Sequence, residues 1–215
     1  MRAAEGESIK TIARRLAVSP STVSRWVRDI DLLPSQEAAL AARDPSTGGR
    51  RAGHRQQQAF ARDQRRRWQD EGRARAREGD ALHRTGCMLH WAEGSKDRCR
   101  VIFCNSDVDM MRLFLRFLRE SYGVADQRLT FTTNCFLGNG LSLAQIERFW
   151  LDALGLPDSC LRKSTVNRPS SASRRRGRVL LHGTARLTLH STQVAQSIYG
   201  AIQEYAGFDR PEWLD

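Results

Sequence analysis

Residues 8–30 read SIKTIARRLAVSPSTVSRWVRDI, and this stretch contains two short helical periods separated by a tight break. The apolar stripe of the second period consists of Val23, Trp26, Val27 and Ile30. Just before it, Ser19 is a natural N-cap, and Pro20 suits the first helical position because its missing N–H would have no partner there. The spacing therefore predicts two short helices joined by a sharp turn.

This stretch resembles a helix-turn-helix DNA-binding unit. Val18, Val23 and Trp26 stand where that family has apolar core residues, whereas Ala17 stands where it usually has glycine. In such units the N-terminal residues of the second helix meet base edges in the major groove. The resemblance implies base or phosphate contacts from Ser21, Thr22, Ser24 and Arg25, and a phosphate contact from Arg28. The alternative is a generic helical hairpin with a solvated polar face.

The charge balance points to a polyanionic partner. The 215 residues include 35 Lys and Arg against 24 Asp and Glu, which gives a net charge of +11. Such an excess suits nucleic acid, an anionic membrane surface or another polyanion. No apolar run approaches the length of a membrane span, and the N-terminus lacks the apolar core of a secretory signal. We therefore expect no membrane partner and a cytoplasmic, nucleoid-associated protein of bacterial type.

The cysteines indicate reduced thiols and no structural zinc site. Their number, five, is odd, and no C-x-x-C pair is present. A disulfide framework and a structural zinc site are therefore not expected.

Residues 43–80 change in character. The first part is rich in Gly, Ser and Arg and is typical of a linker, and the rest is strongly basic. Between Arg50 and Glu78 ten arginines stand against four acids, which predicts a helix that tracks DNA phosphates, with Arg65, Arg66 and Arg67 as candidate contacts. A second Ser/Arg-rich segment adds Arg174, Arg175 and Arg176. The alternative is a solvated connector.

Residues 81–215 hold most of the apolar mass, and their pattern predicts the order helix, strand, helix, strand, helix, hairpin, helix. The hairpin is expected to turn near Gly183, and Gly155 is expected to end the third helix. His90 is read as a core histidine. This order predicts an α+β domain after an N-terminal all-α domain. The predicted boundaries are 1–42 for the helix-turn-helix domain, 43–80 for the basic linker or helix, and 81–215 for the α+β domain.

The segment MLHWAEGSK, residues 88–96, places an acid at the end of an apolar helix, directly before a glycine. It resembles the motif of LAGLIDADG homing endonucleases in the variant form that ends in A-E-G. The strand VIFCN and the polar turn after it fit the same order. The resemblance implies a saddle-shaped α/β domain whose motif helices pack in pairs. Met88, however, stands where the family commonly has a small glycine.

In that family the acids at the ends of two motif helices hold a divalent metal over the scissile phosphates. The resemblance therefore implies Glu93 as the Mg²⁺ ligand and Lys96 or Lys163 as groups that steady the developing charge. Only one motif is present, so a pair of sites needs a homodimer. Related helix-turn-helix regulators carry this fold without cleaving DNA.

We therefore predict a sequence-specific double-stranded DNA-binding protein, a regulator or other non-cleaving binder. The first alternative is a metal-dependent site-specific endonuclease that uses Glu93. The second is an interaction module for RNA or protein.

Overall fold

The computed structural model describes residues 5–43, 45–137, 140–167 and 180–215. The chain divides into two compact units, Met1–Ala61 and Arg62–Asp215. Helix α5 (Pro45–Arg77) begins in the first unit and ends in the second. Each unit is described here by itself.

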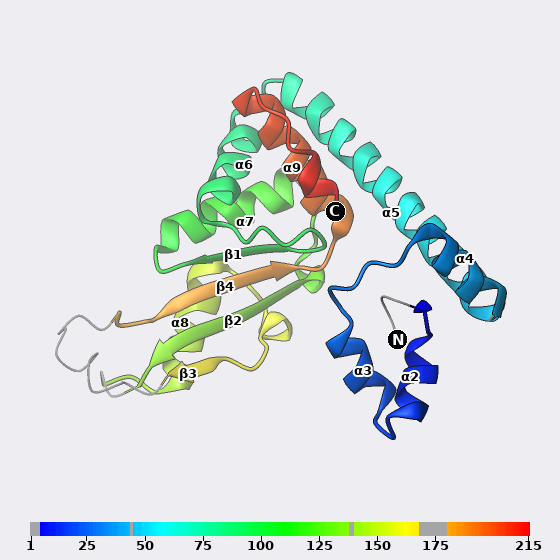
Figure 1. Ribbon diagram of the computed structural model, residues 1–215. Helices are drawn as coiled ribbons and strands as arrows, with labels where there is room; N and C mark the ends of the chain where they lie inside the picture. The colour runs from blue at the N-terminus through cyan, green and yellow to red at the C-terminus, as the bar shows by residue number, and fades with distance from the viewer. Residues whose placement is uncertain (1–4, 44, 138–139, 168–179) are drawn as a thin grey trace. The chain divides into compact units, whose positions relative to one another are not determined.

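The N-terminal unit contains the two predicted helices, α2 (Ile9–Arg15) and α3 (Pro20–Trp26), followed by α4 (Pro34–Arg43) (Figure 1). Ser8 and Ser19 cap α2 and α3, because each hydroxyl accepts a hydrogen bond from the backbone N–H three residues later, at 3.1 Å. The core between the two helices is formed by Ile12, Ala13 and Val23. The two-helix prediction for residues 8–30 is confirmed.

The start of the basic segment differs from the sequence expectation. Residues 43–55 were expected to form a linker, but α5 is helical from Pro45 onward. Proline favours the first helical turn, and the Gln-, Ala- and Arg-rich continuation favours helix strongly enough to extend it back through the glycines. The helix predicted for the basic part is confirmed.

In the second unit, the described residues form one sheet with strand order β1-β4-β2-β3. Strand β4 pairs antiparallel with β1 and β2, and β3 pairs parallel with β2. The strands are β1 (Val101–Asn105), β2 (Leu129–Phe136), β3 (Thr165–Asn167) and β4 (Thr184–Leu189). The helices are α6 (Ala81–Glu93), α7 (Val108–Tyr122), α8 (Leu143–Leu154) and α9 (Thr192–Ala206), with short 3-10 turns η1 (Asp126–Arg128), η2 (Asp158–Cys160) and η4 (Pro211–Leu214). The mixed α+β class is confirmed.

The helices cover one face of this sheet. Inward side chains of the strands, such as Phe103, Phe131 and Leu187, are buried in one core with side chains of α6, α7, α8 and α9. Alternate residues of the same strands point to the other face and are half-buried or exposed. The alternation predicted for β2 is confirmed, and Gly155 ends α8 in the left-handed conformation with φ +60°.

The hairpin expected to turn at Gly183 is wrong in its first arm. Residues 180–183 form a turn, with Leu180 and Leu181 exposed, and residues 178–179 lie outside the described part of the chain. Strand β4 has β1 on one side and β2 on the other, so no edge of β4 is open to a hairpin partner. The three-residue strand β3 was not predicted. Among the described residues, no helix is long and apolar enough to cross a membrane.

Candidate nucleic-acid interface

Helix α3 presents polar side chains around its capped N-terminus. Ser21, Ser24 and Arg25 are exposed and Thr22 is half-buried. The hydroxyls of Ser21 and Thr22 lie 2.7 and 2.8 Å from the Ser19 hydroxyl, so the cap also holds these two side chains. Arg25 makes no hydrogen bond or ion pair with another described residue. The outer face of α3 therefore carries an unpaired guanidinium beside a cluster of hydroxyls.

Trp26 does not join the core, in contrast to the sequence expectation. Its side chain is 60% exposed, whereas Val27 packs against the cluster formed by Ile12, Ala13 and Val23. Val23 and Val27 are one helical turn apart and face α2, so Trp26 lies beside that contact face.

The turn between α2 and α3 carries backbone strain at Ala17. This residue has φ +54°, and it is the non-glycine residue with positive φ in the described part of the chain. A Cβ atom in that region is unfavourable, which is why glycine is usual there. The departure noted in the sequence is therefore a real conformational feature of the turn.

The three arginines singled out in the basic helix have different environments. Arg65 donates from Nε to the carbonyl oxygen of Leu214 at 2.6 Å, and Arg66 pairs with Asp63 at 3.1 Å. Arg67 is exposed and has no partner among the described residues. Arg174, Arg175 and Arg176 lie outside the described residues. Of the three described arginines, Arg67 alone keeps its guanidinium unpaired.

Glu93 is the last residue of α6 and is exposed, without a hydrogen bond or ion pair to another described residue. Lys96 lies nearby, but its ammonium group is held by backbone carbonyls: Nζ donates to Trp91 at 2.6 Å and to Gly94 at 2.9 Å. Burial lowers the pKa of Lys96, and Glu93 partly opposes that shift. Lys96 therefore closes the C-terminal end of α6, where carbonyl groups lack helical partners.

Lys163 lies far from Glu93. One row of paired residues crosses the sheet in the order Gly94, Phe103, Leu187, Phe131 and Leu161. Adjacent strands are about 4.8 Å apart, so Gly94 and Leu161 at the two ends of this row are separated by roughly 19 Å. The structure brings Lys96 to Glu93 and leaves Lys163 at the opposite edge. Among the described residues, no group of three or more His, Cys, Asp or Glu could hold a metal.

The sheet face without helices is a polar surface that the sequence reasoning did not single out. Arg186 stands between Cys104 and Thr132 in register, and its Nε lies 3.2 Å from the Cys104 sulfur. Thr188 stands between Ile102 and Thr130 in the next row. The signal was present in RLTFTTNCF, where every second residue of the strand is polar or less buried. Among the described residues, this surface offers threonine hydroxyl groups and the exposed guanidinium of Arg186.

His90 lies in the core, as predicted. It is fully buried and stacks on Phe114, with ring centroids 5.9 Å apart. Neither ring nitrogen has a hydrogen-bond partner among the described residues, and burial lowers its pKa to about 4. The imidazole is therefore neutral at physiological pH.

The family model of a homeodomain-like domain matches residues 1–31. Neither the curated proteins nor the solved structures gave a match. The N-terminal segment is therefore a homeodomain-like helix-turn-helix domain, a class of domain that suggests DNA binding. The match does not reach residues 81–215, whose resemblance to homing endonucleases stays a prediction.

Proposed function

We propose that this chain is a sequence-specific double-stranded DNA-binding regulator that reads the major groove with α3. The observation that carries this proposal is Arg25, which is exposed and unpaired on the outer face of a capped helix in a homeodomain-like domain. A guanidinium can donate two parallel hydrogen bonds to guanine, and the hydroxyls of Ser21 and Thr22 can contact bases or phosphates beside it. Ser24, Arg28 and Arg67 complete the proposed contacts.

The second unit is proposed to bind DNA through the open face of its sheet. The face carries threonine hydroxyls and Arg186 and is not covered by a described helix. Hydroxyls and guanidinium groups are common donors to phosphate oxygens, and such contacts position a protein without reading sequence. This unit would therefore add affinity, whereas α3 supplies the sequence preference.

The proposed homodimer would form through the outward face of α6. Ala81, Thr85, Met88 and Ala92 line this face, opposite the buried His83, Gly86, Cys87 and His90. The Thr85 hydroxyl donates to the carbonyl of Ala81 at 2.8 Å, so the face presents mainly methyl and methylene groups. Small side chains allow close approach of two helices. A Thr85→Glu variant, at an exposed position of this face, is expected to shift the chain to monomer in light scattering, without loss of helical signal.

The test of DNA binding starts from a duplex library, from which the full chain selects its preferred site. Fluorescence anisotropy then compares Arg25→Ala and Arg67→Ala on the selected site and on a scrambled duplex. We expect Arg25→Ala to lower the affinity for the selected site about tenfold or more and the affinity for the scrambled duplex much less. Arg67→Ala should lower the affinity for both duplexes equally. It should also make the affinity depend less steeply on salt concentration. Selection of no site, or tighter binding to RNA than to duplex DNA, would contradict the proposal and favour an interaction module.

A metal-dependent endonuclease is the second candidate, and it rests on Glu93. An exposed carboxylate without a partner suits Mg²⁺, which binds few protein carboxylates, keeps several waters and takes phosphate oxygens. Bound there, the metal would polarise a phosphate and activate water. Glu93 would hold it, and Lys96 would fix the helix end that carries Glu93. Cleavage of flanking genomic DNA with Mg²⁺, lost in Glu93→Gln, supports this candidate; binding without nicking under every divalent metal excludes it.

A further inference from the structure

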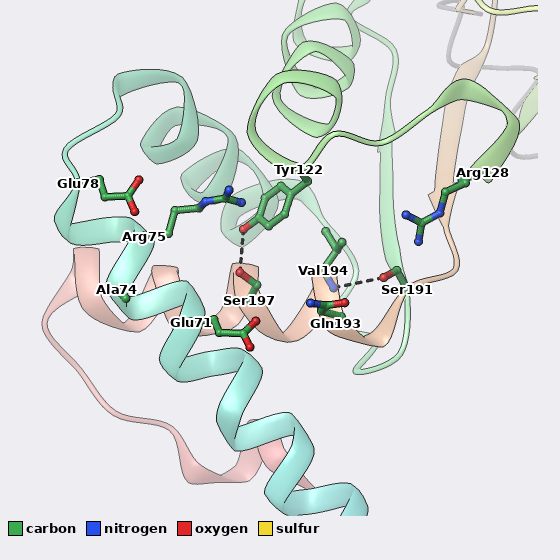
Figure 2. Close-up of a pocket in the computed structure, with 10 residues that line it drawn as sticks. All are labelled: Glu71, Ala74, Arg75, Glu78, Tyr122, Arg128, Ser191, Gln193, Val194 and Ser197. Atoms are coloured by element: carbon green, nitrogen blue, oxygen red, sulfur yellow. Dashed lines mark hydrogen bonds between the residues drawn. The ribbon is translucent and has the colours of Figure 1, made fainter.

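The second unit contains a pocket of about 490 Å³ that the proposed DNA-binding role does not use (Figure 2). It lies among the last turns of α5, the end of α7, η1 and the first turns of α9. Its volume is within the usual range for small-molecule sites, roughly 300–1,000 Å³. The pocket therefore has room for a small ligand.

The pocket gathers four charged side chains, and none of them forms an ion pair with another described residue. Glu71 comes from α5, Glu78 follows directly after its last residue, and Arg128 comes from η1. Arg75 stands between the two acids in sequence, yet its guanidinium lies over the Tyr122 ring, 5.0 Å from the centroid. These charges are available to a ligand.

The two nearest arginines of α5 on either side of Arg75 form ion pairs with acids outside the pocket. Arg73 pairs with Asp209 at 2.7 Å, and Arg77 pairs with Glu204 at 2.8 Å. Both lie outside the pocket lining. Arg75, which lies between them in sequence and lines the pocket, forms no ion pair with another described residue.

The two ends of the pocket differ in sign. Figure 2 shows Glu71, Arg75 and Glu78 on the α5 side, with the Arg75 side chain directed at Tyr122, and Arg128 with Ser191 at the other end; the two acids outnumber Arg75, so the α5 side is net negative. The second end also receives the N-terminus of α9, where Ser191 caps the backbone N–H of Val194 at 3.3 Å. The N–H groups of Thr192 and Gln193 precede the first helical hydrogen bond, so they can donate to an anion. One end thus suits a cationic group and the other an anionic one.

We propose that this pocket binds a small zwitterionic molecule, with its anionic group at Arg128 and the start of α9 and its cationic group at Glu71 and Glu78. The Tyr122 ring, whose hydroxyl oxygen lies within hydrogen-bond distance of the Ser197 hydroxyl (3.3 Å) and of His83 Nε2 (3.1 Å), forms the wall between the two ends. The proposal concerns a site apart from α3 and the open sheet face, and it stands or falls independently of DNA binding.

The test uses isothermal titration calorimetry on the full chain with probes that differ in charge and length. The zwitterions are γ-aminobutyrate, δ-aminovalerate and ε-aminocaproate, and the singly charged analogues are caproate and n-hexylamine. Exposed ion pairs are weak, so we expect the best zwitterion to bind about fivefold more tightly than either singly charged probe. If no zwitterion binds better than both analogues, the proposal is overturned.

Variants test which end of the pocket binds the anionic group of the ligand and which end binds the cationic group. Arg128→Ala should weaken the binding of the zwitterion and of caproate, each about fivefold, and leave the binding of n-hexylamine unchanged. The double variant Glu71→Gln and Glu78→Gln should weaken the binding of the zwitterion and of n-hexylamine and leave the binding of caproate unchanged. Arg116→Ala, an exposed arginine on α7 outside the pocket lining, is the matched control. Equal losses in Arg128→Ala and Arg116→Ala, or displacement of the zwitterion by duplex DNA, would overturn a small-molecule site.

Discussion

Gly72 in α5 and Gly200 in α9 bring the backbones of the two helices into direct contact. A Cβ atom on Gly72 would lie 1.9 Å from the carbonyl oxygen of Ser197, and one on Gly200 would lie 1.9 Å from that of Gln69. Buried amides run along the same contact: Gln69 donates to Gln196 at 2.8 Å and accepts from Gln203 at 3.0 Å. The end of the basic helix is thereby part of the α/β unit.

A methyl group at this contact should therefore disrupt it. We expect Gly72→Ala to lower the free energy of unfolding by about 3 kcal/mol, because backbone atoms of a packed helix must move aside. Gly79→Ala is the control, since Gly79 has φ +80° but nothing within 4 Å of the added methyl. That variant should lose only about 1 kcal/mol from backbone strain. Urea unfolding measures both, and equal losses would show that close packing is not the cause.

The buried histidines predict loss of stability in acid. Burial lowers the pKa of both His83 and His90 to about 4, from an ordinary 6.5. Below pH 6.5 the unfolded chain therefore binds protons that the folded chain does not. Stability should be fully present above pH 6.5 and fall as the pH drops toward 4, by up to roughly 3 kcal/mol for each histidine. Urea titrations across this pH range measure the slope.

The two histidines should respond differently to substitution. His90 has no hydrogen-bond partner among the described residues. His90→Leu should therefore leave the free energy of unfolding at neutral pH unchanged or raise it, by at most about 1 kcal/mol. It should also remove about half of the loss of stability in acid. His83 contacts the hydroxyls of Tyr205 at 2.8 Å and Tyr122 at 3.1 Å. His83→Leu should therefore lose about 2 kcal/mol at neutral pH. A large loss in His90→Leu would mean that its nitrogens have partners.

Lys96 and Lys163 form a matched pair for the helix-end role. Lys96→Met removes the donor to the carbonyls of His90, Trp91 and Gly94 and should lower stability by about 1.5 kcal/mol. Lys163→Met removes an exposed ammonium and should change stability by less than about 0.5 kcal/mol. Thermal melts compare the two. Equal effects would argue against the capping role of Lys96.

Ala17→Gly should stabilise the helix-turn-helix domain. Glycine adopts the positive φ in the turn between α2 and α3 without the strain that alanine has there. Glycine also raises the conformational entropy of the unfolded chain, which opposes this gain but is the smaller effect. The expected net gain is about 0.5 kcal/mol, measured by urea unfolding of the full chain with a probe in the first unit such as Trp26 fluorescence. Ala13→Gly, in the buried face of α2, should have the opposite sign.

Local signals predicted the elements of this fold well. Ser19 with Pro20 marked the start of α3, and Gly155 marked the end of α8, because caps depend on one or two neighbouring residues. The first arm of the expected hairpin failed because Leu180 and Leu181 have strand-like character, yet both sides of β4 are already paired. Which strands pair with β4 depends on β1 and β2, which lie far from it in the sequence.

The sites were less predictable for the same reason. Glu93 and Lys163 were grouped by the resemblance to homing endonucleases, and the register of the sheet places them far apart. The contact between Gly72 and Ser197, and the pocket between α5 and α9, join segments more than a hundred residues apart. Local periodicity carries no information on which glycine faces which carbonyl.

The cluster of Ile12, Ala13 and Val23 contains the three fully buried apolar side chains described in the N-terminal unit, whereas the second unit has a far larger core. Amide protons of α2 and α3 should therefore exchange with deuterium through low-energy local opening, while those of β4 and α9 exchange only when the whole second unit unfolds. A DNA ligand held only at α3 should slow exchange in the first group and leave the second unchanged, whereas one that also contacts the open sheet face should slow exchange in β4 as well. Exchange rates would thus show which unit a ligand holds without any substitution.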